Sequence, residues 1–284
     1  MSSHMKKVGI VACSNGQKRE YEEQIKNLEM TLLAMNLQPV FSQYIYEKES
    51  VFSGTAKERA DALMQFYKDD EITEIFDISG GNVANGILPY LDYEVIAKSD
   101  KRFWGYSDLT TVNNAIYAKT GKPSVLYQIK NLVLDESGQQ MIDFKKTMIE
   151  GGDALFHPDY HFIQQQAMQG VVVGGNIRCF LKLSGTEYMP DLTGKILLLE
   201  SLGGTVAQME TALCQLQQLG AFDKVAGLLL GTFTTMERQQ YVPAIETLVK
   251  RLVREDLPIA VTKYIGHGTD SKAIVIGESL GLEI

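Results

Sequence analysis

The sequence contains few of the features that mark several common protein classes. It has three cysteines in 284 residues, one tryptophan and four histidines. An odd number of widely spaced cysteines favours reduced thiols over a disulfide framework or a structural zinc site. No apolar run approaches the roughly 18 residues that a membrane-spanning helix needs, and the six fairly apolar residues 8–13 are too few for a secretory signal. These absences predict a cytoplasmic protein.

Positive charge is also scarce, since the 27 Lys and Arg residues are outnumbered by 35 Asp and Glu residues and the net charge is −8. Nucleic acids and anionic membranes bind to basic surfaces, so we expect neither as a partner. The rest of the composition is ordinary for a globular protein, with 45% hydrophobic and 22% charged residues. The opening MSSHM is typical of a cloning remnant, so residues 1–4 are left out of the expected fold.

Strands and helices alternate in the first half of the chain. Apolar patterning predicts strands at residues 8–12, 40–46, 72–78 and 103–106, and helices at residues 21–35, 56–67 and 109–119. This alternation is typical of a parallel sheet that is covered by helices on both faces. We therefore predict an N-terminal α/β domain with a parallel sheet over residues 5–134.

The second half of the chain has a different pattern. Residues 135–166 are polar and lack a clear period, so we predict a connection between domains. Strand-like segments follow, with one long helix among them: they cover residues 170–174, 195–200, 226–233 and 273–276, and the helix covers residues 205–219. The pattern favours a smaller, mixed and β-rich C-terminal domain over residues 167–284.

The stretch FWGYSDLTTV, residues 103–112, joins the fourth strand to its helix and places Ser107 at the junction. Ligands of open α/β sheets bind at the carboxyl ends of strands. Gly105-Tyr106-Ser107 is similar to the left half of the Gly-x-Ser-x-Gly elbow, which presents a nucleophile, but Leu109 replaces the second glycine. The simpler interpretation is a helix cap, which the local pattern alone favours.

A nucleophilic serine also needs donors for an oxyanion. The backbone N–H of Asp108, at the helix start, is one candidate. The neighbouring turn SGGNVANG follows the third strand, and Gly80 or Gly81 in it is the candidate for the second donor, because glycine allows close backbone approach.

The serine further needs a base, and the base an orienting acid. His157 and His161 lie in the polar connection and are expected to be solvated loop residues. His267 lies between two glycines, which suggests a turn that presents its ring, although the spacing alone does not exclude a loop histidine that caps or hydrogen-bonds locally. Glu200 closes a buried strand, where a carboxylate needs a partner unless the strand end is exposed.

Seven stretches that run through most of the chain are specific when taken together. They are VACSNG, ISGGNVANGILPYLDY, FWGYSDLTTV, VVGGNIRCFLKLSGTEYMPDLTGKILLLE, METALCQLQQLGAF, GLLLGTF and IGHG. With them the chain resembles the LD-carboxypeptidase family of serine peptidases, which includes murein tetrapeptide carboxypeptidases and microcin self-immunity peptidases. The resemblance implies a triad of Ser107, Glu200 and His267. It also implies a nucleotide-binding-like N-terminal domain and a mixed C-terminal domain that carries the acid and the base.

The implied reaction is hydrolysis of the bond between an L-centre and a C-terminal D-amino acid in a small murein-derived peptide. It proceeds through an acyl-enzyme and needs no metal or other cofactor. Asn176 and Arg178 of GGNIR are candidate donors to the substrate carboxylate, with structural roles as the alternative. Family members tend to form homodimers, and the sequence leaves the oligomeric state open.

The microcin-type alternative uses the same triad to cleave a peptidyl-nucleotide and is expected to need an aromatic platform for the base. Trp104 precedes the elbow and is interpreted as a core residue, while Phe156, Tyr160 and Phe162 of the connection are available to form that platform.

Two features depart from the family pattern. SVLYQIKNLV stands where a Gly-Pro-containing stretch is common, which puts substrate contacts there in question, and the tail GTDSKAIVIGESLGLEI is short, so the last strands are expected to be trimmed.

Other classes fit the sequence less well. A class I amidotransferase has cysteine at the elbow, whereas the cysteines here are Cys13, Cys179 and Cys214. A dinucleotide-binding oxidoreductase has Gly-x-Gly-x-x-Gly after its first strand, and VACSNGQ offers only Gly16. A non-catalytic two-lobed small-molecule binding protein is physically possible, but it leaves the serine, glutamate and histidine without a joint purpose.

Overall fold

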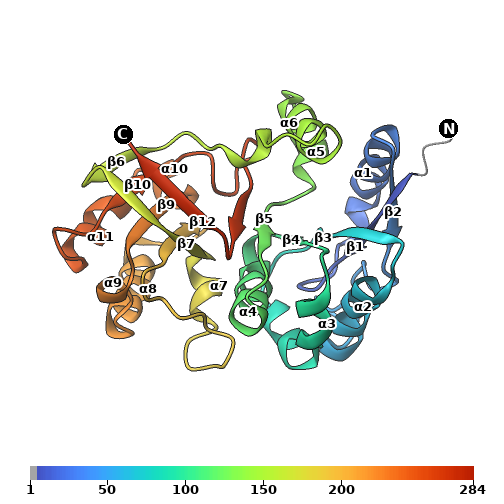
Figure 1. Cartoon of the computed structure of the whole chain (residues 1–284), viewed down its shortest axis with the longest axis horizontal. Coiled ribbons are helices and arrows are strands. Elements are labelled where there is room, and N and C mark those ends of the chain that lie inside the picture. The colour runs from blue at the N-terminus through green and yellow to red at the C-terminus, as the bar shows by residue number, and fades with distance from the viewer. Residues whose placement is uncertain (1–4) are drawn as a thin grey trace.

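The computed structural model describes residues 5–284, which form two six-stranded sheets with helices around them. Residues 1–4, expected to be a cloning remnant, lie outside the described residues. Figure 1 shows the two sheets in separate halves of the molecule, with the helix α4 (Thr110–Thr120) near the boundary between them. Over residues 5–284, no helix has both the length and the apolar character needed to cross a membrane.

The first sheet has the strand order β11-β5-β4-β3-β1-β2. All neighbouring strands in it are parallel except β11, which runs antiparallel to β5. The strands are β1 (Lys6–Val11), β2 (Leu37–Phe41), β3 (Ile72–Asp77), β4 (Phe103–Gly105), β5 (Ser124–Leu126) and β11 (Ile274–Ile276). The helices of this half are α1 (Glu22–Ala34), α2 (Ala56–Lys68), α3 (Tyr93–Lys98), α4, α5 (Asn131–Leu134) and α6 (Gln139–Met148), with 3-10 turns η1 (Arg19–Tyr21), η2 (Ala84–Tyr90), η3 (Ser107–Leu109) and η4 (Ala154–Phe156). The predicted parallel α/β architecture is confirmed.

The second sheet has the strand order β12-β7-β8-β9-β10-β6. Its four inner strands are parallel, and the two outer strands are antiparallel to their neighbours, so the predicted mixed sheet is confirmed. The strands are β6 (His161–Gln164), β7 (Ala167–Asn176), β8 (Ile196–Ser201), β9 (Gly227–Phe233), β10 (Ile259–Val261) and β12 (Ser279–Glu283). The helices are α7 (Ile177–Leu181), α8 (Val206–Gln218), α9 (Ala221–Lys224), α10 (Thr234–Arg238) and α11 (Ile245–Leu252).

Three segments differ from the sequence expectations in detail. The strand expected at residues 40–46 is β2, which ends at Phe41 and contains Pro39. Proline lacks an N–H, but β2 is the edge strand of its sheet and tolerates it. The connection at residues 135–166 contains α6 and β6, and the tail after His267 forms β11 in the first sheet and β12 in the second.

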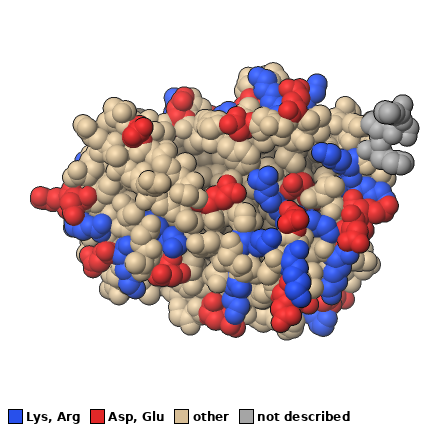
Figure 2. Space-filling model, viewed as in Figure 1, with Lys and Arg blue, Asp and Glu red and all other residues tan. Residues whose placement is uncertain are grey.

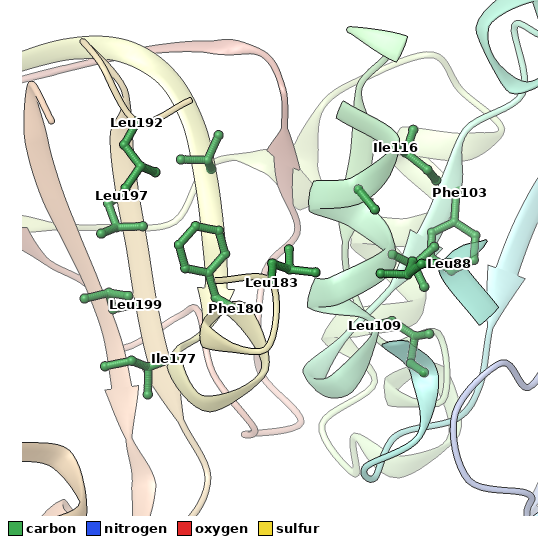
Figure 3. Close-up of a cluster of buried hydrophobic side chains, with 14 of the residues drawn as sticks. Leu88, Phe103, Leu109, Ile116, Ile177, Phe180, Leu183, Leu192, Leu197 and Leu199 are labelled. Atoms are coloured by element: carbon green, nitrogen blue, oxygen red, sulfur yellow. The ribbon is translucent and has the colours of Figure 1, made fainter. Parts of the chain in front are cut away.

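One apolar core continues from the first half of the molecule into the second. Figure 3 shows Leu109 and Ile116 on the side of α4 and Phe180 and Leu183 on the side of α7, and all four belong to one buried cluster. Contacts between α4 and both α7 and β7 bring the halves together. The helix that follows Ser107 is therefore the element on which the C-terminal half is docked.

Polar contacts fix the same docking. The side chain of Asn114 in α4 accepts from the backbone N–H of Gly174 in β7 and donates to its carbonyl, at 2.9 Å each. The backbone N–H of Asn176 donates to Thr110 Oγ1 at 3.0 Å. These buried pairings fix the register of β7 against the helix, so residues at the C-terminal ends of β7 and β8 lie near the start of α4.

Candidate active site

Ser107 lies at a sharp turn between β4 and α4. Its φ is +59°, a left-handed conformation that non-glycine residues adopt at a cost of about 1–3 kcal/mol. A Cβ on Gly105 would come within 2.6 Å of Leu109 Cβ, so the tight turn requires glycine there. Within residues 5–284, the hydrogen bond of the Ser107 hydroxyl is to His267, and neither η3 nor α4 receives a side-chain cap. The geometry is therefore that of a strained elbow, and the helix-cap interpretation is wrong.

His267 lies between Ser107 and Glu200. Its Nε2 is 3.1 Å from Ser107 Oγ, and its Nδ1 is 2.8 Å from Glu200 Oε2. Glu200 is the penultimate residue of β8 and is fully buried. An ionised carboxylate only accepts hydrogen bonds, so Nδ1 is the donor and the lone pair of Nε2 points to the serine hydroxyl. The three residues come from positions up to 160 apart and form one hydrogen-bonded chain.

The turn that carries His267 is fixed by a serine hydroxyl. Ser271 Oγ accepts from the N–H of Gly266 at 2.9 Å and donates to its carbonyl at 2.6 Å. The carbonyl of the preceding Ile265 accepts from the N–H of Thr232 in β9 at 2.8 Å. The imidazole is thus presented by a loop anchored on both sides, which limits its rotation.

Two backbone N–H groups near Ser107 are free to bind an oxyanion. Within residues 5–284, neither the N–H of Gly81 nor that of Asp108 donates a hydrogen bond. Gly81 has a φ of +125°, which only glycine adopts readily, and lines both cavities beside Ser107. Gly80 is also adjacent, because a Cβ on it would lie 3.8 Å from Ser107 Cβ. The assignment of these groups as the oxyanion hole stays a prediction.

Two buried polar atoms beside the histidine have no partner. Glu200 Oε1 and Tyr106 Oη make no hydrogen bond within residues 5–284. The Tyr106 ring meets the His267 ring edge-on, with centroids 5.1 Å apart. Burial, and after it the negative charge of Glu200, raises the pKa of Tyr106 well above its usual range. Tyr106 therefore stays neutral, and its buried ring packs against one side of the imidazole.

The side chain of Asp108, next to the serine, holds several segments together. Its Oδ2 accepts from Ser14 Oγ at 2.6 Å and from the N–H of Ala84 at 2.9 Å, and its Oδ1 pairs with Lys182 Nζ. Lys182 also donates to the carbonyl of Asn82 at 2.9 Å. Sequence analysis missed Lys182, since no local pattern connects residues 74 apart.

Lys182→Met is expected to lower the free energy of unfolding by about 3 kcal/mol, because it leaves the fully buried Asp108 carboxylate without its counter-ion. Urea denaturation measures the change. The matched control is Lys119→Met, which removes an exposed pair with Glu187 and should change stability by less than about 1 kcal/mol. Equal effects of the two substitutions would contradict a structural role of the buried pair.

Two cavities meet at Ser107. The larger has a volume of about 820 Å³ and lies toward α7 and α8, and the smaller has a volume of about 310 Å³ and lies toward the segment after β5. Ser107, Gly81 and Leu202 line both cavities. His267 lines only the smaller one. A substrate that spans the two cavities would place its scissile bond at the serine.

The candidate carboxylate donors lie in the larger cavity. Asn176 Oδ1 caps α7 by accepting from the N–H of Cys179 at 3.2 Å, so its carbonyl group is structural. Arg178 donates to Asn82 Oδ1 at 2.9 Å and to the carbonyl of Gly81 at 3.0 Å. Binding of substrate by either residue stays a prediction, and the structure shows a structural contact for each.

His157 and His161 line neither of the cavities at Ser107. His157 forms an exposed pair with Asp153 at 2.7 Å, in keeping with the expected loop position, whereas His161 begins β6. Trp104 is buried in the core, as expected.

Residues 5–284 contain no group of three or more His, Cys, Asp or Glu side chains arranged to hold a metal ion. On the face shown in Figure 2, Lys and Arg are interspersed with Asp and Glu.

Two family models match this chain. The LD-carboxypeptidase N-terminal domain matches residues 8–127, and the LD-carboxypeptidase C-terminal domain matches residues 169–282. The microcin self-immunity protein MccF of Escherichia coli is 31% identical over 268 residues, which cover 81% of this chain and 77% of that protein. The murein tetrapeptide carboxypeptidase of Pseudomonas aeruginosa is 23% identical over 273 residues, which cover 90% of this chain and 88% of the relative.

Solved structures share the fold. MccF in complex with glutamyl sulfamoyl guanosine superimposes with a TM-score of 0.87 at 20% identity, covering 99% of this chain and 94% of the other. The muramoyltetrapeptide carboxypeptidase of Oxalobacter formigenes superimposes with a TM-score of 0.81 at 21% identity, covering 98% and 95%. At these identities the likeness shows the two-domain fold alone.

Proposed function

Because the chain belongs to the LD-carboxypeptidase family of peptidases, we propose that it is a serine carboxypeptidase that removes a C-terminal D-amino acid from a murein-type peptide. The observation that supports this most is the hydrogen-bonded chain from Glu200 through His267 to Ser107, placed where two cavities meet. A serine hydroxyl is a weak nucleophile until a base takes its proton, and this arrangement supplies the base.

In the proposed mechanism, His267 Nε2 takes the proton of Ser107 as Oγ attacks the scissile carbonyl. Glu200 stabilises the imidazolium, and its charge is effective because the Glu200 carboxylate is fully buried. The N–H groups of Gly81 and Asp108 bind the oxyanion of the tetrahedral intermediate. The imidazolium then protonates the departing nitrogen, and water, activated by the same histidine, hydrolyses the acyl-enzyme.

The position of His267 gives the two cavities different roles. The group that protonates the leaving nitrogen must lie within hydrogen-bond reach of it. Since His267 lines only the smaller cavity, the leaving amino acid belongs there and the acyl part of the peptide belongs in the larger one. The volumes of about 310 Å³ and 820 Å³ suit a single residue and a longer peptide, respectively.

The 31% identity to MccF makes cleavage of a peptidyl-nucleotide the second candidate. The aromatic residues expected to form its base platform are engaged elsewhere. Phe156 packs on Trp104 with centroids 6.0 Å apart, and Tyr160 packs edge-on against Phe162 at 5.9 Å. In the part of the chain that the structure describes, none of these four residues lines either cavity at Ser107. This favours the murein-type peptide.

The test is a matched pair of tetrapeptides that differ only in the configuration of the last alanine. We expect release of D-alanine with a kcat/KM at least ~10²-fold above that for L-alanine. Inverting the centre moves the methyl group into the wall or draws the carboxylate from its donors, and unpaired buried donors cost about 1–3 kcal/mol each. Equal rates, or a preference for the L-form, would contradict LD-specificity while leaving the triad in place.

A fluorophosphonate probe separates the hydrolase from a non-catalytic binding protein. An activated serine reacts with the probe, so we expect labelling at Ser107 and loss of labelling when the protein is unfolded first. Absence of labelling in the folded protein, together with binding of a peptide without turnover, would favour the binding protein.

A further inference from the structure

The smaller cavity is lined by two lysines in different electrostatic surroundings. Lys272 Nζ is paired with Asp143 at 2.7 Å and donates to the carbonyl of Ala154 at 2.8 Å. Lys130 Nζ donates one hydrogen bond, to the neutral Gln17 Oε1 at 3.1 Å. No carboxylate in residues 5–284 lies within 4 Å of Lys130 Nζ. The cavity therefore contains one neutralised cation and one half-buried cation without a counter-ion.

Burial of the Lys130 ammonium is unfavourable in this state. Desolvation lowers the pKa of Lys130, and the negative charge of Asp77 offsets this only in part. The oxygens of Asp77 are occupied by the N–H of Cys13 at 2.7 Å and by the N–H and hydroxyl of Ser79 at 2.7 and 2.5 Å. A buried charge without a partner costs free energy that a bound anion would recover.

The chemistry of the leaving group supplies such an anion. The amino acid that departs occupies the cavity that His267 lines, and its carboxylate is attached to the carbon that bears the departing nitrogen. We propose, on the basis of the function proposed above, that Lys130 binds the carboxylate of the released C-terminal residue. This contact makes a free terminal carboxylate a requirement and so restricts cleavage to the last residue of the peptide.

The geometry favours Lys130 over Arg178 for this role. Arg178 lines the larger cavity, where the acyl part of the peptide lies, and its guanidinium is engaged by Asn82 and Gly81. An anion bound by Arg178 would belong to the acyl peptide. Lys130 lies in SVLYQIKNLV, the stretch that departs from the family pattern, so the contact is a property of this chain's own sequence.

The test compares a tetrapeptide that ends in D-alanine with the same peptide ending in D-alaninamide. A charge-assisted hydrogen bond contributes about 1.5–3 kcal/mol, which corresponds to about 10- to 100-fold in kcat/KM. For Lys130→Met we expect kcat/KM to fall by this factor with the free carboxylate and to change less than ~3-fold with the amide. The wild-type preference for the carboxylate should therefore largely disappear.

The matched control is Arg178→Met, which removes a cation from the other cavity. It should affect both peptides alike and leave the carboxylate-to-amide ratio at the wild-type value. The rate of fluorophosphonate labelling at Ser107 in Lys130→Met should equal that of the wild type, which shows that the fold and the triad are intact. A wild-type ratio in Lys130→Met, or loss of the ratio in Arg178→Met alone, would overturn the proposal.

A binding measurement keeps this proposal distinct from the proposed function. We expect calorimetric titration to detect binding of D-alanine to the wild type. The affinity of Lys130→Met for D-alanine should be at least ~10-fold weaker, and the substitution should leave the affinity for D-alaninamide unchanged. If the wild type cleaves neither peptide, the proposed function fails, and the D-alanine titration still decides the role of Lys130. Equal binding of D-alanine by both proteins would overturn that role.

Discussion

Ser107→Ala is expected to reduce turnover by about 10⁶-fold while the protein keeps its fold. The Ser107 hydroxyl is the group that His267 Nε2 contacts at the elbow, so its removal leaves the base without the hydroxyl that it activates. Residual acceleration of about 10³–10⁴-fold over water is expected from binding and the oxyanion donors. Release of the terminal residue, measured alongside the unfolding midpoint in urea, tests both parts of the expectation.

A serine that lines neither cavity provides the control for this substitution. Ser137 Oγ donates to Asp135 and accepts from the N–H of Gln139 in an exposed turn, so Ser137→Ala makes the same chemical change outside the site. The turnover of Ser137→Ala should match that of the wild type. Near-normal turnover of Ser107→Ala would contradict the nucleophile assignment and leave the elbow as a strained turn of unknown purpose.

The strand-to-helix turn at Ser107 could be predicted from local sequence because its determinants are local, although the local pattern alone favoured a helix cap. Gly105 permits the tight turn, and the helical spacing after Asp108 marks the start of α4. The strands β1, β3 and β4 were predictable for a similar reason, since each contains a short, buried apolar run. Even so, the position of β2 was missed, because only the position of the strand at the sheet edge explains why Pro39 is tolerated.

The segment at residues 135–166 shows where periodicity is insufficient. The helix α6 buries Gln140 and Asp143 beside Phe144, so its buried face lacks the apolar pattern of an amphipathic helix. Gln140 is satisfied by Tyr127 and Ser271, and Asp143 by Lys272, all of which are partners from other segments. A helix that packs through polar contacts is not visible to hydrophobic patterning.

The site itself was predictable only in part. Glu200 and His267 could be selected as candidates from a buried strand end and a glycine-flanked turn, and from the family resemblance. The distance that joins His267 to Ser107 depends on the docking of β7 against α4 through Asn114, which no local pattern reveals. Lys130 was missed, although its segment was noted as a departure, because its lack of a counter-ion is a property of the folded cavity.

Substitution of the base and of the acid should separate their roles. His267→Ala is expected to cost about as much as Ser107→Ala, because the serine is a weak nucleophile without the base and the base has no nucleophile to activate without the serine. Glu200→Gln is expected to cost less, about 10⁴-fold, since an amide can hold the imidazole but favours the wrong tautomer and carries no charge. The initial rates of terminal-residue release give both values.

Glu200→Gln should not lower the stability of the protein, although it lowers turnover. Its carboxylate is fully buried, and Oε1 has no hydrogen-bond partner within residues 5–284. Glu200→Gln removes this buried charge, so the free energy of unfolding should stay the same or rise. A residue kept only for structure would show the reverse, with loss of stability and little loss of turnover.

The double variant Ser107→Ala with His267→Ala tests whether the two residues act as one unit. Once either is lost, the remaining acceleration comes from the oxyanion donors at Gly81 and Asp108 and from substrate binding, which the second substitution leaves unchanged. We therefore expect the double variant to be about as slow as each single variant, within ~10-fold. Losses that multiply would mean that Ser107 and His267 contribute independently, and the 3.1 Å contact between them would then be structural, not the proton-transfer path of a serine peptidase.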